Sequence, residues 1–91
     1  MSHTIQDKTK LLARVRRLRG QVDAIERALV AEAECGEVMH LVAAVRGAIG
    51  GLSHELIEHH MRSHVLDAET DGVSRERAAA ELMSVLRTYV K

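Results

Sequence analysis

Apolar residues recur at alternating steps of four and three along two long segments of this chain, which contains no proline. In the first segment these residues are Leu11, Val15, Leu18, Val22, Ile25 and Leu29. The second segment repeats the steps at Val38, Val42, Val45, Ile49, Leu52 and Leu56. This spacing is that of a coiled-coil seam, and the lack of proline leaves both helices uninterrupted. The pattern predicts two long helices that pack along each other.

The three predicted helices cover residues 4–29, 37–66 and 75–89. Residues 31–36 form the predicted connection between the first two helices, with Gly36 available for an irregular backbone. Ser74 is the predicted N-cap of the third helix. Because a short connection makes neighbouring helices antiparallel, the predicted fold class is all-α. It consists of a long antiparallel helical hairpin and a short third helix, in a single domain over residues 1–91.

Chain length and glycine content indicate that the chain associates with further copies of itself. A chain of 91 residues buries only about 60–65% of its unfolded surface and is marginally stable alone. Gly47, Gly50 and Gly51 interrupt the second helix, which suggests either close approach of another helix or a kink. We therefore predict that copies of the chain associate and share a core.

One cysteine and several histidines carry the donor atoms of a transition-metal site. His60 and His64 are four residues apart, so on a helix they share a face and can bind one ion together. Cys35 lies in a polar setting, and removal of the initiator methionine exposes the Ser2 amine beside the His3 imidazole. One thiolate with several nitrogens suits Co, Ni, Cu or Zn rather than Mg or Ca.

The spacing of these residues predicts a site between two chains. Cys35 and His60 are 25 residues apart, which in a straight helix is about 37 Å, so they cannot bind one ion within one chain. In an antiparallel dimer, Cys35 of one chain meets His60 and His64 of the other. The neighbouring His59 is expected to pack or to make a polar contact instead. The predicted metal ligands are Ser2, His3, Cys35, His60 and His64.

The charges sum to zero but are unevenly distributed. Residues 1–30 contain seven Lys and Arg against three Asp and Glu, a net charge of +4. No acidic residue occurs between Lys8 and Gln21, which favours contact with DNA phosphates over a merely solvated face. No helix-turn-helix signature is present, so the first helix is not expected to act as a conventional recognition helix. The predicted DNA-binding residues are Lys10, Arg14, Arg16, Arg17 and Arg19.

Motifs of enzymes and of exported proteins are missing from the sequence. There is no HExxH motif, no Gly-rich phosphate loop and no Ser-His-Asp pattern. The single cysteine cannot form an internal disulfide, and neither a secretory signal nor a long apolar span is recognised. We therefore expect a cytoplasmic protein that is not an enzyme and has no membrane partner.

The chain resembles a family of bacterial repressors, the copper, nickel/cobalt and formaldehyde sensors CsoR, RcnR and FrmR. The resemblance rests on Cys35, the paired histidines, the basic first helix and the segment Val45-Arg46-Gly47-Ala48, and it covers essentially the whole chain. It implies an all-helical dimer that pairs into a dimer of dimers and binds operator DNA without a helix-turn-helix. It also implies that an inducer bound between subunits weakens this binding and releases an export or detoxification operon.

Within this resemblance the chain is most similar to the nickel/cobalt sensors, whose opening Met-Ser-His-Thr-Ile it shares. Copper and persulfide sensors carry a second cysteine. Formaldehyde sensors typically have proline at position 2 and lack histidine at position 64, whereas this chain has Ser2 and His64. One departure is Gly50, at a position where the family usually has asparagine. The expected inducer is Ni(II) or Co(II); the alternatives are a formaldehyde bridge between Cys35 and the N-terminal amine, and a metal-storing helical oligomer without DNA binding.

Overall fold

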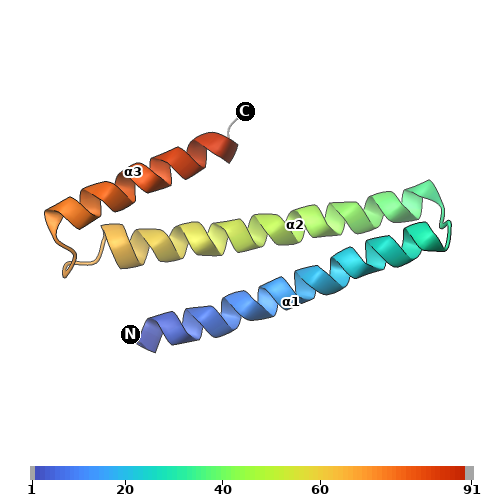
Figure 1. Ribbon diagram of the computed structural model, residues 1–91, viewed down its shortest axis with the longest axis horizontal. Helices are drawn as coiled ribbons and strands as arrows, with labels where there is room; N and C mark the ends of the chain where they lie inside the picture. Colours follow the sequence, from blue (N-terminus) through green and yellow to red (C-terminus); the bar gives the residue numbers. More distant parts are fainter. Residues whose placement is uncertain (1, 90–91) are drawn as a thin grey trace. The chain divides into compact units, whose positions relative to one another are not determined.

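The computed structural model describes the backbone of residues 2–89 and the side chains of residues 7–89. Its elements are α1 (Ser2–Val30), α2 (Cys35–His60), the π-helical turn η1 (Met61–Val65) and α3 (Gly72–Tyr89); Figure 1 labels the three α-helices. The described residues contain no strand, so the all-α prediction is confirmed. By its internal contacts the chain divides into two compact units, Met1–Ser53 and His54–Lys91.

In the first unit, α1 and the adjoining part of α2 run antiparallel as a helical hairpin (Figure 1). Only every second residue of each predicted seam is covered. The half-buried residues form an inner row, which consists of Leu11, Leu18 and Ile25 on α1 and Val38, Val45 and Leu52 on α2. The exposed residues form an outer row, which consists of Val15, Val22, Leu29, Val42, Ile49 and Leu56.

The covered face of α1 is therefore turned by one residue from the predicted seam. Beside the inner row, the covered residues of α1 include Arg14, Gln21 and Ala28. A Cβ atom at Gly51 would lie 2.8 Å from Nη1 of Arg14, so the glycine leaves room for this guanidinium group. Gly47 and Gly50 have no such neighbour within 4 Å among the described residues. Among the described residues, none of the three glycines lies against the backbone of another helix, and Gly51 faces the side chain of Arg14 instead.

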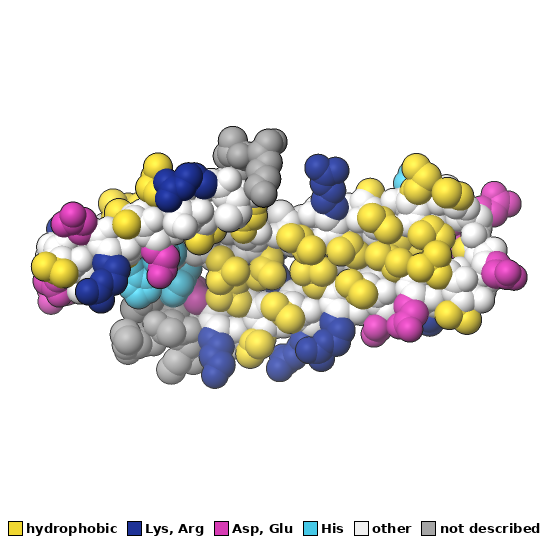
Figure 2. Space-filling view, turned by 45° about the horizontal axis from the view of Figure 1, so that its top comes forward, with side chains coloured by type: hydrophobic (Ala, Val, Ile, Leu, Met, Phe, Trp, Pro, Cys, Tyr) yellow, Lys and Arg dark blue, Asp and Glu magenta, His cyan; other side chains and the backbone are white. Residues whose placement is uncertain are grey.

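One copy of the chain covers very little of its apolar surface. Of the described residues, only Ala28 and Leu82 are buried, although 46% of the sequence is hydrophobic. In the outer row, Val22 and Ile49 are each 48% exposed. Figure 2 shows apolar side chains gathered in a band along the hairpin. Covering such a band with a second apolar surface is favourable by about 25 cal/mol per Å² of apolar area.

The segment Cys35–Val65 is long and apolar enough to cross a membrane, by length and composition alone. The expectation that the chain has no long apolar span was therefore too strict. The same composition suits a helix that packs on α1 through its inner row and keeps a second apolar row for another protein surface. Arg46 lies near the middle of this segment.

A tight turn over residues 31–34 joins α1 to α2. Two backbone hydrogen bonds of 2.9 and 3.1 Å form a Schellman motif at the end of α1. Glu32 takes the left-handed conformation that this motif requires, with a φ of 56°. Because α2 already begins at Cys35, Gly36 is helical. The prediction of an irregular backbone at Gly36 was wrong, since the motif places the left-handed residue at Glu32.

In the second unit, α3 packs against η1 and buries Leu82. Asp71 caps α3, because its Oδ1 accepts a hydrogen bond from Ser74 N at 2.8 Å and its Oδ2 one from Ser74 Oγ at 3.0 Å. The backbone bond from Ser74, followed by the hydroxyl bond, lowers the pKa of Asp71 from its ordinary value of 3.8. The prediction of Ser74 as the N-cap was wrong, since α3 begins at Gly72.

Candidate metal centre

The two predicted histidine ligands lie together at the end of α2. His60 is the last residue of α2, and His64 lies in η1. Their ring centroids are 5.2 Å apart, with the ring planes inclined by 60°. Two imidazoles on one ion, with metal–nitrogen bonds of about 2.0–2.1 Å, place their centroids roughly 4.5–5.2 Å apart at angles of about 90–110°. The observed distance between the two rings lies at the upper end of this range.

His60 is held in place by α3. Its Nε2 atom lies 2.9 Å from the carbonyl oxygen of Ala78, and its ring is half-buried. Because a carbonyl oxygen only accepts, Nε2 carries the hydrogen and donates it. This leaves Nδ1 of His60 as the nitrogen that can bind a metal, with the other ring nitrogen held by the protein. The sequence contains no signal for Ala78, because every residue carries a backbone carbonyl group.

His59 is a neighbour of this pair. Its half-buried ring packs edge-on against the ring of His64, with centroids 6.3 Å apart and planes at 88°. This agrees with the expectation that His59 packs, but the group it packs against is a predicted ligand. Residues five apart do not share a face of a regular α-helix, so no sequence pattern indicated the contact.

Cys35 begins α2, at the opposite end from His60. Its side chain is exposed, and Sγ lies 3.7 Å from Sδ of Met39. The 26 residues of α2 span about 39 Å, so the Cys35 thiol and the His60 imidazole cannot bind one ion within a chain. No group of three or more His, Cys, Asp or Glu among the described residues is placed to hold a metal ion. Within one chain, the predicted ligands Cys35 and His60 therefore lie in two separate places.

The remaining predicted ligands are Ser2 and His3. Their side chains lie outside the described residues, although the helical backbone of α1 begins at Ser2. Their part in a metal site stays a prediction.

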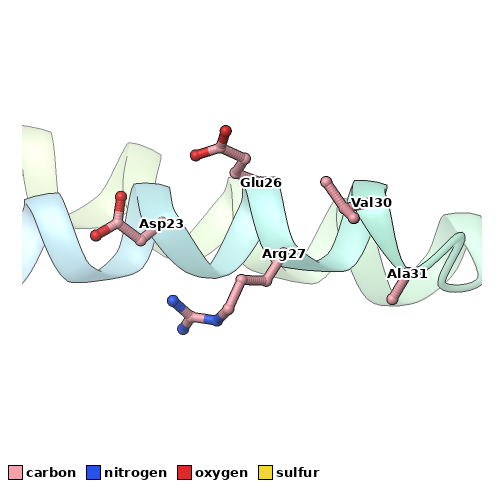
Figure 3. A pocket seen from close by; sticks show the side chains of 5 residues that line it. All are labelled: Asp23, Glu26, Arg27, Val30 and Ala31. Atoms are coloured by element: carbon pink, nitrogen blue, oxygen red, sulfur yellow. The ribbon is translucent and has the colours of Figure 1, made fainter.

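A surface hollow at the end of α1 contains none of the predicted ligands. Its lining residues, which Figure 3 labels, are Asp23, Glu26, Arg27, Val30 and Ala31. In Figure 3 the carboxylate of Glu26 and the guanidinium group of Arg27 point to opposite sides of the helix. The hollow does not contain a group of three or more His, Cys, Asp or Glu placed to hold a metal ion.

The predicted DNA-binding residues divide into two kinds. Four are exposed along α1, namely Lys10, Arg16, Arg17 and Arg19. Figure 2 shows Lys and Arg side chains along the α1 edge of the hairpin. Arg14 is half-buried instead, with its guanidinium group over Gly51. Four of the five predicted residues are therefore exposed to solvent along α1.

Comparison with known proteins identifies the family. Residues 7–88 match the model of the metal-sensitive transcriptional repressors. The chain is 42% identical to the transcriptional repressor RcnR of Citrobacter koseri and 41% identical to RcnR of Salmonella typhimurium, each over 91 residues and the full length of both chains. It is also 50% identical, over the full length of both chains, to a Serratia marcescens protein named for its place in the bioA 5′ region.

A solved structure shares the fold. It is a Glu-to-His variant of the formaldehyde-responsive regulator FrmR from Salmonella enterica serovar Typhimurium, with a TM-score of 0.87 and 44% identity. The match covers 93% of this chain and 96% of that chain. Because the family consists of repressors, the prediction that the chain is not an enzyme is confirmed. The chain belongs to the metal-sensitive transcriptional repressors.

Proposed function

We propose that this protein is a cytoplasmic repressor that binds operator DNA and is released when Ni(II) or Co(II) binds between two chains. Release would derepress the gene of a metal exporter. The observation that carries the proposal is the His60–His64 pair, whose rings are spaced for one ion at 5.2 Å. A free thiol is available at Cys35, which is exposed. One thiolate with several imidazoles suits the later first-row metals.

The relatives support nickel and cobalt as the inducers. The RcnR proteins are 41–42% identical to this chain over its full length. The FrmR variant carries histidine in place of glutamate at a position with the same number as His64. Along the first-row transition metals, affinity for a site of nitrogen and sulfur ligands rises toward Cu. Selection for Ni or Co therefore has to come from coordination geometry. A six-coordinate ion needs the Ser2 amine and the His3 imidazole in addition to Cys35, His60 and His64.

The exposed outer row supports a dimer. A second copy has an identical apolar row, so two hairpins can cover each other's outer rows in a four-helix arrangement. If the two α2 helices run antiparallel, Cys35 of each chain lies by the histidine pair of the other. Two equivalent sites then form per dimer, and dimers pair further into a tetramer.

The exposed basic residues of α1 support DNA binding. Lys10, Arg16, Arg17 and Arg19 place four positive charges on one helix. Such a surface binds phosphates, and its affinity falls steeply with salt. Arg14 joins this set if its guanidinium group leaves Gly51. Ser2 and His3 directly precede these basic residues in the sequence. Metal binding by Ser2 and His3 can therefore change how α1 binds DNA.

A second candidate inducer is formaldehyde, which the likeness to FrmR favours. In that case a methylene bridge joins the Cys35 thiol to the N-terminal amine. The third alternative from the sequence, a metal-storing oligomer without DNA binding, has no support in the family.

The inducer is tested by titrating a protein–promoter complex with Ni(II), Co(II), Zn(II), Cu(I) and formaldehyde in a gel-shift assay. We expect release by Ni(II) and Co(II), and loss of that release in His64→Ala. An aldehyde response does not need His64, so it persists in the variant if formaldehyde is the inducer. Full Ni(II) and Co(II) response in His64→Ala contradicts the metal assignment.

The bridging geometry is tested by mixing two inactive variants. Neither Cys35→Ala nor the double variant His60→Ala/His64→Ala should bind Co(II) tightly alone. Refolded together, they form heterodimers with one intact site out of two, so the Co(II)–thiolate absorption band should reappear. If no band returns although heterodimers are present, the site does not bridge two chains.

The basic surface is tested with Arg16→Ala/Arg17→Ala. This variant should weaken promoter binding and reduce the slope of log K against log salt by about 0.9 for each phosphate that the protein no longer neutralises. The control, Arg77→Ala/Arg87→Ala, removes the same charge from exposed positions on α3. Equal promoter affinity of the two variants contradicts the assignment.

A further inference from the structure

Three imidazoles lie within one helical turn at the end of α2, and the proposed function uses two of them. His64 contacts His60, at 5.2 Å between ring centroids, and His59, at 6.3 Å. The contact with His59 is edge-to-face, since the ring planes meet at 88°. Aromatic rings favour this arrangement at centroid distances of about 4.5–7 Å. His59 is half-buried, whereas His64 is exposed.

The π-helical turn brings these residues together. In a regular α-helix, residues five apart point about 140° away from each other around the axis. In η1, Leu66 N donates instead to Met61 O, five residues earlier, at 2.8 Å. A π-turn holds more residues per turn than an α-helix, so residues four and five apart both approach the same face. His64 therefore lies against His59 as well as against His60.

The two proposed ligands are held by different means. His60 is oriented by the hydrogen bond from its Nε2 to Ala78 O. No hydrogen bond to the His64 side chain is found within residues 7–89, and its ring lies against the rings of His59 and His60. A metal-binding histidine is normally oriented by a second group, which lowers the loss of freedom on binding. For His64, the ring of His59 takes the role of this orienting group.

We propose that His59 is a positioning residue of the metal site, whose ring packs edge-on against His64 and directs its nitrogen toward the ion. The inference rests on the proposed function, because it takes His64 as a ligand. His59 acts through its ring and not through a nitrogen–metal bond. Removing this edge-to-face packing weakens metal binding by roughly two- to tenfold.

The test is a Co(II) titration of the full-length, metal-free protein, followed by the visible d–d and thiolate bands. His59→Ala should bind Co(II) roughly two- to tenfold more weakly, with altered d–d bands. His59→Phe keeps the edge-on ring but has no nitrogen, so it should restore both affinity and bands. The control is His54→Ala, which removes an exposed imidazole from the same helix, where it pairs with Glu58 at 3.5 Å. This control should behave as the unmodified protein.

Two results overturn the proposal. If His59→Ala matches His54→Ala, His59 does not position His64. If His59→Phe is as weak as His59→Ala, the nitrogen of His59 matters rather than its ring. His59→Gln, which is polar and has no ring, replaces His59→Ala if that variant does not fold by circular dichroism. The proposed function is judged separately by His60→Ala and His64→Ala: unchanged Co(II) binding in both means that the site itself lies elsewhere.

Discussion

The two ends of α2 hold their proposed ligands in contrasting ways. At the cysteine end, residues 28–39, Cys35 is exposed and its sulfur lies 3.7 Å from the sulfur of the flexible Met39 side chain. At the histidine end, residues 59–82, His60 donates a 2.9 Å hydrogen bond to Ala78 O. There Arg75 also donates to the carbonyl oxygens of Asp67 and Thr70, at 3.0 and 2.9 Å, which ties the loop to α3.

This contrast suggests that the two ends contribute differently to metal binding. The histidine end is organised within one chain, so it can present two imidazoles at a defined spacing before any ion arrives. At the cysteine end Ala28 is buried, but the Cys35 side chain is exposed, so the position of its thiol depends on what packs beside it. In the proposed dimer, that neighbour is the histidine end of the other chain.

The largest expected difference between the two ends is in packing. Leu82→Ala removes the buried residue of α3 and should lower the free energy of unfolding by about 2–5 kcal/mol. At the cysteine end, Val30 is 79% exposed, so Val30→Ala should change the free energy of unfolding by less than about 0.5 kcal/mol. Thermal melting of the metal-free protein compares the two variants. Equal losses would show that Leu82 stabilises the chain no more than the exposed Val30 does.

The proposed ligands should differ in their effect on the metal-free protein. His60→Ala leaves Ala78 O without its donor and should cost about 0.5–1.5 kcal/mol of stability. Cys35→Ser alters an exposed group and should stay within about 0.5 kcal/mol. Urea unfolding in the presence of a chelator measures both. A larger loss in Cys35→Ser than in His60→Ala would reverse the comparison.

The turn at the cysteine end stores backbone strain that can be relieved. Glu32 has a φ of 56°, a left-handed conformation that costs a non-glycine residue about 1 kcal/mol. Glu32→Gly should therefore stabilise the chain, by up to about 1 kcal/mol. Glu34→Gly is the matched control, because Glu34 has no positive φ and gains only freedom in the unfolded state. A lower melting temperature in Glu32→Gly than in the unmodified protein contradicts the Schellman motif.

The smallest effect concerns the cap of α3 at the histidine end. The pKa of Asp71 is lowered in the folded state, so the carboxylate stabilises the fold above its unfolded pKa, and this contribution is lost as pH falls through the lowered value. Asp71→Asn keeps a capping oxygen but cannot ionise. The melting temperatures of the two proteins should differ at pH 7 and converge in acid. A difference that does not change with pH would rule out this role of the charge.

The proposed ligands show what can be read from residue spacing. The four-residue step from His60 to His64 predicted a shared face, and the structure places the rings 5.2 Å apart. The separation of 25 positions predicted that Cys35 and His60 lie too far apart to bind one ion within a chain, and the structure places them at the two ends of α2. The contacts that orient the histidines could not be predicted, because one uses a backbone carbonyl group and the other depends on a π-turn.

By itself, the sequence determined the helices and their antiparallel pairing, because helical periodicity and helix breakers are local properties of the chain. It did not determine which face of each helix is covered. On α1, the inner row could be covered together with Val15 and Val22 on one side or with Arg14 and Gln21 on the other. The side with Val15 and Val22 is the more apolar of the two. Only the tertiary structure places Arg14 and Gln21 inside instead, since the choice depends on space that Gly51 leaves on the other helix. The fit between two helices depends on both of their surfaces, so it cannot be read from the residue pattern along either helix alone.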